Sequence, residues 1–181
     1  MSIFVSYSSS DVPHVGALLS EKDQLPFKEE FELWVAYQKR GNKKNIEPGS
    51  SFTPVILEAI EESSGAILFL SDSFLDAEFI TQVELPAIFN KKERNNSYPI
   101  IPILVNKDID YSNYPKLEGM QLSNSPTTPL ADQTGNRYRL ILRDALDQLN
   151  YNPSKGRFKY LLNNKGSYRF ATLFLVLSLI I

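Results

Sequence analysis

One carboxylate in this chain, Glu84, has neighbours that are unusual for a charged side chain. On a helix its same-face neighbours are Ile80 and Thr81 one turn before it, and Ala87 and Ile88 one turn after it. We therefore expect this side chain either to be half-buried or to line a pocket. Partial burial would raise its pKa and make it a better base, unless hydrogen bonds offset the effect. The alternative is an ordinary surface glutamate near the edge of a helix face.

The composition excludes several other kinds of site. The chain has 181 residues, no cysteine and one histidine. Thiol catalysis, disulfides, cysteine-ligated zinc and a multi-histidine metal site are therefore excluded, and we expect no metal. The net charge of −2 gives no support for bulk electrostatic binding to nucleic acid. The length is sufficient to bury a sizeable core without disulfides or metal.

The apolar pattern predicts strands that alternate with helices. Pro86 should kink the third helix, because proline lacks the N–H donor and clashes with the carbonyl one turn back. The polar segment 38–52 contains Pro48 and Gly49, so we expect a long loop there. Strands are expected at 3–6, 31–37, 66–70, 100–105 and 119–123, and helices from Pro13, from Thr53-Pro54, after Ser71 to about Asn90, and over 138–149.

Such an alternation implies right-handed β-α-β units and a parallel sheet. We predict an α/β fold, a flavodoxin-like three-layer sandwich with a five-stranded parallel sheet of order 2-1-3-4-5. Its switch point lies between the first and third strands, so a ligand is expected at the carboxyl ends of these two strands. The residues there are Ser6 to Asp11 and Ser71 with Asp72.

Tyr7, Ser8 and Ser9 are candidate substrate-binding residues at the exit of the first strand. The helix that begins near Asp11 would direct its N-terminus to this place, which favours phosphate or ribose oxygens. A simple serine-rich turn explains these three residues equally well.

Ser71 and Asp72 are further candidates, because they lie across the switch point from the first strand. Asp72 is also a good helix N-cap, which is the simpler interpretation of it. Trp34 is the only tryptophan and stands at the end of the short second strand. Core packing is its simplest interpretation.

The end of the chain differs in character from the rest. Residues 170–181 are almost purely apolar, and residues 151–169 form a basic linker before them. A bilayer core requires about 20 apolar residues, so the run is too short to span as it stands. A truncated transmembrane helix, a buried terminal element and an interfacial anchor all remain open. Since Ser2 leads directly into a strand pattern, we expect no signal peptide and a cytoplasmic domain over 1–150, anchored to a membrane only if this segment is an anchor.

Four separated segments belong together: IFVSYSSSD at 3–11, FELW at 31–34, EPGS at 47–50, and ILFLS at 67–71 with Glu84 beyond it. In this order and at this spacing they resemble a TIR (Toll/interleukin-1 receptor) domain of the prokaryotic NAD-cleaving type. They match its opening strand and turn, its second strand, the Pro-Gly of its long loop, and its third strand. Glu84 matches the glutamate on the helix that follows.

The resemblance implies an NAD⁺ glycohydrolase (NAD⁺ nucleosidase), with NAD⁺ as substrate and no cofactor. Glu84 stands at the position of the catalytic glutamate, and Trp34 near an aromatic residue that lines the nicotinamide–ribose pocket. One carboxylate suffices, because nicotinamide is already cationic in NAD⁺ and leaves as a neutral molecule without a general acid, whereas ordinary glycosidases need two carboxyl groups. The carboxylate would stabilise the oxocarbenium-like ribose or hold its hydroxyls. The products would be nicotinamide with ADP-ribose, or with a cyclic isomer if the enzyme is also a cyclase.

The resemblance also implies partners. Family enzymes are typically active only when assembled, and the loop that here contains Pro48 and Gly49 docks against a neighbouring copy. We therefore expect a homo-oligomer or filament of TIR domains whose activity depends on concentration, with a role in anti-phage defence or cell-death signalling.

Two departures from the enzyme pattern support a different interpretation. Ile80 stands where many NAD-cleaving members have tryptophan, and Ser8 and Ser9 stand where some have arginine. These differences put adenine stacking and phosphate contacts in doubt. The alternative is a non-catalytic TIR signalling scaffold that acts by binding other TIR domains.

Overall fold

A computed structural model of the chain describes residues 1–26, 30–36, 39–40, 43–44, 51–107 and 109–149. All of them belong to one compact unit, Met1–Leu149. The expected loop residues Pro48 and Gly49, the basic linker and the apolar C-terminal segment lie outside the described residues.

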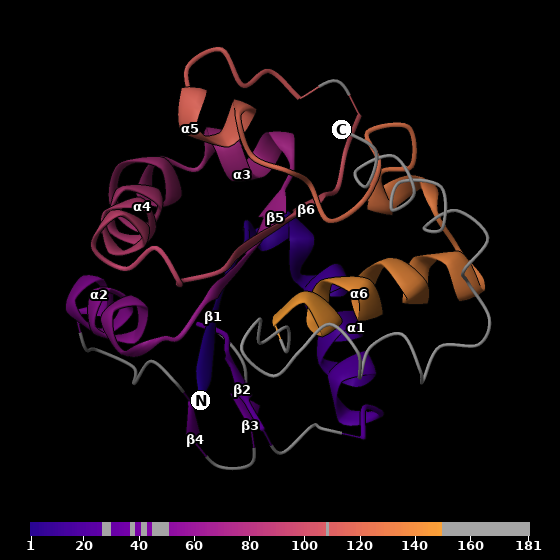
Figure 1. Cartoon of the computed structure of the whole chain (residues 1–181), viewed down its shortest axis with the longest axis horizontal. Coiled ribbons are helices and arrows are strands. Elements are labelled where there is room, and N and C mark those ends of the chain that lie inside the picture. The colour runs from indigo at the N-terminus through magenta and orange to yellow at the C-terminus, as the bar shows by residue number, and fades with distance from the viewer. Residues whose placement is uncertain (27–29, 37–38, 41–42, 45–50, 108, 150–181) are drawn as a thin grey trace, which may run out of the picture. The chain divides into compact units, whose positions relative to one another are not determined.

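A four-stranded parallel sheet forms the centre of this unit (Figure 1). Its order is β2-β1-β5-β6, which confirms the predicted arrangement of the first four strands. A separate antiparallel pair, β3 with β4, lies in the segment for which we expected only a loop. The strands are β1 (Ser2–Ser6), β2 (Glu32–Trp34), β3 (Lys39–Arg40), β4 (Lys43–Lys44), β5 (Ala66–Leu70) and β6 (Ile100–Leu104).

Helices cover both faces of the sheet and give the three layers. Figure 1 shows α1 and α6 on one side of the sheet and α2, α4, α3 and α5 on the other. Two separate hydrophobic clusters match these two sides. The helices are α1 (Val12–Asp23), α2 (Phe52–Glu62), α3 (Asp72–Asp76), α4 (Leu85–Arg94), α5 (Pro115–Glu118) and α6 (Gly135–Leu149).

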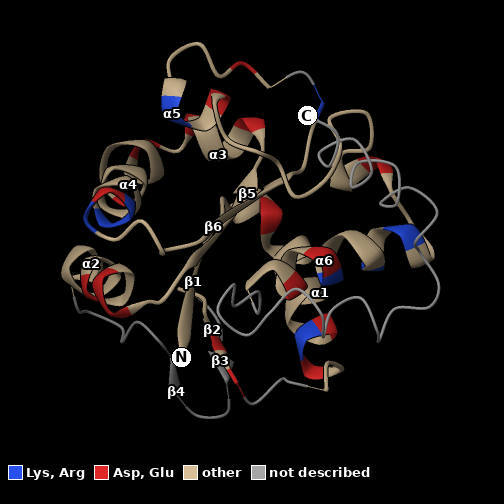
Figure 2. Cartoon of the chain, viewed as in Figure 1, with Lys and Arg blue, Asp and Glu red and all other residues tan. Residues whose placement is uncertain are grey.

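The strand sequences explain why the sheet is buried. Every residue of β5 is buried, as expected for a central strand that is apolar throughout. Successive side chains of a strand point to opposite faces, so Phe4 and Leu68 enter the cluster beneath α2 and α4, and Ile3 and Ile67 enter the cluster beneath α1 and α6. The strands β1, β5 and β6 carry no charged residue, whereas the helices around them carry many (Figure 2).

Among the described residues no fifth strand pairs with the outer edge of β6, and segment 119–123 forms no strand, so that expectation was wrong. The amide of Ser123 donates to the carbonyl of Pro102 at 2.8 Å. Beyond it the Asn124 side chain replaces a strand: its Oδ1 accepts the Leu104 N–H at 2.8 Å and its Nδ2 donates to the Leu104 carbonyl at 3.0 Å. One amide side chain thus satisfies both backbone groups of Leu104, which a fifth strand would have bonded.

The helix expected after Ser71 is also more complex than predicted. It is divided into α3, a π-helical turn at Ile80–Glu84, and α4. Pro86 lies in the first turn of α4, directly after the π turn. The disturbance that proline causes is therefore taken up by a widened turn instead of a simple kink.

A buried lysine joins α4 to α2. Lys91 Nζ donates to the carbonyl of Ile60 at 2.9 Å, to that of Ser63 at 2.6 Å, and to that of Glu61. These carbonyls belong to the end of α2, where the last backbone acceptors of a helix have no partner within it. The ammonium group therefore closes the C-terminus of α2 and fixes it against α4.

Candidate active site

The carboxyl end of β1 is the place where the topology predicts a ligand. In the sheet β1 lies between β2 and β5, so the chain adds a strand first on one side of β1 and later on the other side. This is the switch point of the fold. Ser6, the last residue of β1, is paired in register with Leu68 of β5. Because it follows Phe4 by two residues, its side chain points to the same face of the sheet, the one covered by α2 and α4.

Glu84 reaches this end of the sheet from the π turn. Its side chain is buried, with the residue only 7% exposed, and its Oε2 accepts a hydrogen bond of 2.5 Å from Ser6 Oγ. The expected burial is confirmed, and an ordinary surface position is excluded. Burial raises the pKa of Glu84 to about 7, although the hydrogen bond from Ser6 opposes the shift. At neutral pH the group is therefore divided between its acid and carboxylate forms.

A second buried carboxylate, Asp11, connects the exits of β1 and β5. Its Oδ2 accepts the hydroxyl of Ser8 at 2.6 Å and the hydroxyl of Ser71 at 2.8 Å. The Ser8 amide also approaches the same oxygen at 3.3 Å. Ser71 Oγ in turn accepts the amide of Phe74, so Ser71 is the N-cap of α3, a role that we had considered for Asp72. Both predicted hydroxyls are thus engaged in holding the two loops together.

Trp34 lies on the same face of the sheet as Ser6 and Glu84. It is paired in register with Phe4, and their rings stack with centroids 5.2 Å apart and planes inclined by 18°. Its side chain is only partly buried and packs against the cluster beneath α2 and α4. Phe4 and Ser6 form one row along β1, so Trp34, which lies beside Phe4 on β2, is on the same face as the Ser6 hydroxyl that bonds Glu84.

The other predicted residues are distributed differently. Tyr7 packs against the cluster beneath α1 and α6, which is the opposite face of the sheet from Glu84. Ser9 is exposed at the start of a short 3-10 turn, Ser9–Asp11, and Asp72 is exposed as the first residue of α3. The structure therefore brings Glu84 and Trp34 to one face, joins Ser8 to Ser71 through Asp11, and leaves Tyr7 apart.

The topology placed Ser6 and Asp11 at the expected ligand crevice, but neither of them was assigned a role in the site from the sequence. A signal existed for each of them. Ser6 is the polar end of an otherwise apolar strand, and Asp11 follows Ser8 by three residues, the spacing at which an acidic side chain reaches back to a cap residue. What the sequence does not show is that their partners, Glu84 and Ser71, come from distant parts of the chain.

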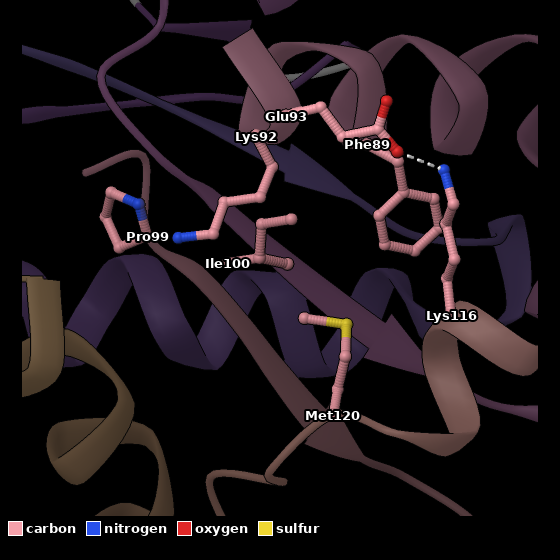
Figure 3. Close-up of a pocket in the computed structure, with 7 residues that line it drawn as sticks. All are labelled: Phe89, Lys92, Glu93, Pro99, Ile100, Lys116 and Met120. Carbon is pink, nitrogen blue, oxygen red and sulfur yellow. Dashed lines mark hydrogen bonds and ion pairs between the residues drawn. The ribbon is translucent and has the colours of Figure 1, made fainter. Parts of the chain in front are cut away.

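A separate pocket of about 500 Å³ lies elsewhere (Figure 3). Phe89, Lys92 and Glu93 of α4 line one side of it, together with Ile100, the first residue of β6. Lys116 of α5 pairs with Glu93 at 2.6 Å across its rim. Because the strands are parallel, the start of β6 is at the opposite edge of the sheet from Ser6, so this pocket is not part of the Glu84 site.

The site contains acid–base and aromatic groups but no cluster of metal ligands. Within the described part of the chain, no three His, Cys, Asp or Glu side chains come together as a metal site. The same residues include no helix that is long and apolar enough to cross a bilayer. A buried carboxylate that is half ionised near pH 7 can accept a proton or stabilise a positive charge that develops next to it.

Two solved structures are similar to this chain. The TIR domain of the Toll-related receptor TRR-2 from Hydra magnipapillata is similar in structure, with a TM-score of 0.53 and 19% identity over 82% of this chain and 98% of that one. The TIR domains of the activated Roq1 resistosome, which directly recognises the pathogen effector XopQ, give a TM-score of 0.44 and 20% identity over 83% and 84%. No curated protein matches the chain. The family model described as TIR domain matches residues 3–135, most of the chain, and the protein belongs to the TIR domain family.

Proposed function

We propose that this TIR domain is an NAD⁺ glycohydrolase in which Glu84 is the catalytic residue. The observation that carries the proposal is the position of Glu84: a buried carboxyl group at the switch point, bonded to the last residue of β1. Family membership alone does not decide the matter. A buried carboxylate placed where α/β folds bind their ligands is a candidate for function on physical grounds.

The reaction would use Glu84 in its carboxylate form. The bond between C1 of the ribose and the nicotinamide nitrogen breaks, the bonding electrons leave with nicotinamide, and the ribose carbon becomes cationic. The Glu84 carboxylate would stabilise this cation or hold the ribose hydroxyls. Water then adds to C1 and releases a proton, which gives ADP-ribose. Attack by a nitrogen of the adenine would instead give a cyclic isomer.

The surrounding groups support this role for Glu84. Ser6 directs one carboxylate oxygen by its 2.5 Å hydrogen bond, which leaves the other oxygen for the substrate. Trp34 offers a partly exposed aromatic surface on the same face of the sheet, suited to the nicotinamide or ribose. Burial of Glu84 strengthens its electrostatic effect, because interactions are stronger where water is excluded.

Assembly is part of the proposal. With only 7% of Glu84 exposed, the substrate can reach it only if the structure opens at the carboxyl end of the sheet. Contact with a second copy would cause this opening. We propose that the segment containing Pro48 and Gly49 makes this contact in the cytoplasm. Activity would then rise more steeply than in proportion to protein concentration, as expected for defence or cell-death signalling by self-association.

The test is NAD⁺ consumption at several protein concentrations, with nicotinamide, ADP-ribose and cyclic products resolved. Glu84→Gln should abolish turnover, because the amide cannot carry the negative charge. Glu58→Gln is the matched control, since Glu58 is an exposed carboxylate on α2, and it should keep full activity. Turnover by Glu84→Gln at the wild-type rate would show that another residue is responsible.

The same experiment examines the scaffold alternative. If wild-type protein consumes no NAD⁺ at high concentration, even when crowded or immobilised, the chain acts by binding other TIR domains. In that case Glu84 and Ser6 would form a structural hydrogen bond only.

A further inference from the structure

The turn that carries Glu84 has an irregular backbone. Residues Ile80–Glu84 are π-helical, and the amide of Leu85 donates to the carbonyl of Ile80, five residues back, where an α-helix would bond four residues back. Such a turn contains one residue more than a turn of α-helix. Residues before it are therefore rotated by about 100° relative to a continuous α-helix.

This rotation decides which residue is buried one turn before Glu84. The buried positions of α4 are Leu85, Ile88 and Lys91. Regular α-helical spacing would continue them backwards to Glu84 and Thr81, with Ile80 only at the margin of the same face. In the structure Ile80 is buried instead, at 5% exposure, and Thr81 is only partly buried.

The Thr81 hydroxyl is used within its own turn. It donates to the carbonyl of Ala77 at 3.2 Å and approaches that of Glu78 at 3.3 Å. The offset thus directs an apolar side chain into the core with Glu84 and keeps a hydroxyl away from it.

Pro86 accounts for the offset. A proline inside an α-helix has no N–H to donate, and its ring clashes with the carbonyl four residues back, which here is that of Gln82. A π turn at this point moves that carbonyl out of the way. Pro86 is itself exposed, so packing does not explain its presence.

We propose that Pro86 is a positioning residue for Glu84: it maintains the π turn that places Ile80, and not Thr81, in the core beside the carboxyl group. Insofar as it concerns catalysis, this inference rests on the proposed NAD⁺ glycohydrolase activity. Its structural part does not, because the titration of Glu84 can be followed without any substrate.

The first test compares Pro86→Ala with the wild type. Without the proline the helix can run regularly, Thr81 returns to the buried face, and its hydroxyl becomes available to the carboxylate. Burial holds the pKa of Glu84 at about 7 in the wild type, and it should fall towards the ordinary 4.5 in the variant. In the wild type the urea midpoint should fall between pH 4.5 and pH 7, because the folded protein holds a proton that the unfolded chain has released. In the variant this fall should be smaller. For cleavage of NAD⁺, the acidic half of the pH profile should shift down by about one pH unit, which at pH 6 is about a fivefold gain relative to the plateau.

Pro115→Ala is the matched control, because Pro115 is an exposed proline in the first turn of α5, away from this site. It should leave both profiles unchanged. A Pro86→Ala variant with the wild-type pH dependence of unfolding would overturn the proposal. If the wild type cleaves no NAD⁺, the proposed function fails, but the unfolding experiment still decides this inference.

A second pair of variants tests the same idea without altering the helix ladder. Ile80→Val and Ile80→Thr have nearly the same shape and differ in one hydroxyl. Ile80→Val should keep the raised pKa of Glu84, and Ile80→Thr should lower it. Equal pH profiles for the two variants would overturn the proposal even if Pro86→Ala failed to fold.

Discussion

Replacing Glu84 by glutamine should stabilise the fold at neutral and alkaline pH. The pKa of Glu84 is raised by burial from an ordinary value of 4.5 to about 7. Between these two pH values the folded protein holds a proton that the unfolded chain has released, so wild-type stability falls as pH rises through this range. Glutamine never ionises. The variant should therefore lose none of this stability.

The magnitude follows from the same two values. Each pH unit between 4.5 and 7 corresponds to about 1.4 kcal/mol, so the full effect is about 3–4 kcal/mol. Below pH 4.5 both states of the wild type are protonated, and the two proteins should differ only by a constant packing term. Above pH 7 the difference should reach its maximum and stay there. A free-energy difference of this size is a large part of the total stability of a small domain.

The assay is urea unfolding of both proteins at half-unit steps from pH 4.5 to pH 8.5. Other titrating groups, such as His14, change equally in both proteins and cancel in the difference. A constant difference across the whole range would refute the reasoning, because it would show that Glu84 is not held protonated by the fold. Combined with loss of NAD⁺ cleavage in the variant, a growing difference would show that this carboxylate is kept at the expense of stability.

Three further outcomes are expected. Ser6→Ala removes the hydrogen bond that opposes the effect of burial, so the pKa of Glu84 should rise above 7 and the pH midpoint of NAD⁺ cleavage should move up with it. Asp11→Ala leaves the hydroxyls of Ser8 and Ser71 without their acceptor and should cost about 2–4 kcal/mol in urea unfolding, whereas Asp11→Asn, which keeps an acceptor oxygen, should cost less. Lys91→Met leaves the carbonyls at the end of α2 unpaired, so it should cost about 2 kcal/mol or more and accelerate hydrogen exchange in the last turn of that helix.

The strand pattern was predictable because it depends on local composition. The run from Ala66 to Leu70 is apolar throughout, and it forms β5 with the predicted bounds. The prediction of a strand at 119–123 failed for a tertiary reason. The side chain of Asn124 takes the hydrogen bonds of the Leu104 backbone, and no run of alternating residues in the sequence indicates such a contact. The two-residue strands β3 and β4 are too short to produce a period at all.

The candidate site was predictable in its residues more than in its contacts. Isoleucines at helical spacing on either side of Glu84 indicated burial, which the structure confirms. The role of Ser6 depends on how the π turn packs against the end of β1, so sequence spacing could not reveal it. Pro86 indicated that the helix is irregular at this point, but a kink and a π turn have the same sequence signal. The choice between them depends on which side chain, Ile80 or Thr81, the core accepts.

The outer edge of β6 has a consequence for how copies of this protein meet. A free edge strand acts as a template on which another chain adds by backbone pairing, the usual route to aggregation. Here Pro102 has no N–H to offer and its carbonyl is occupied, and both backbone groups of Leu104 are held by Asn124. If copies of this chain assemble as proposed above, the blocked backbone groups of Pro102 and Leu104 keep them from extending the sheet across this stretch of β6. Under that proposal, the copies would recognise one another through surfaces other than this stretch of β6.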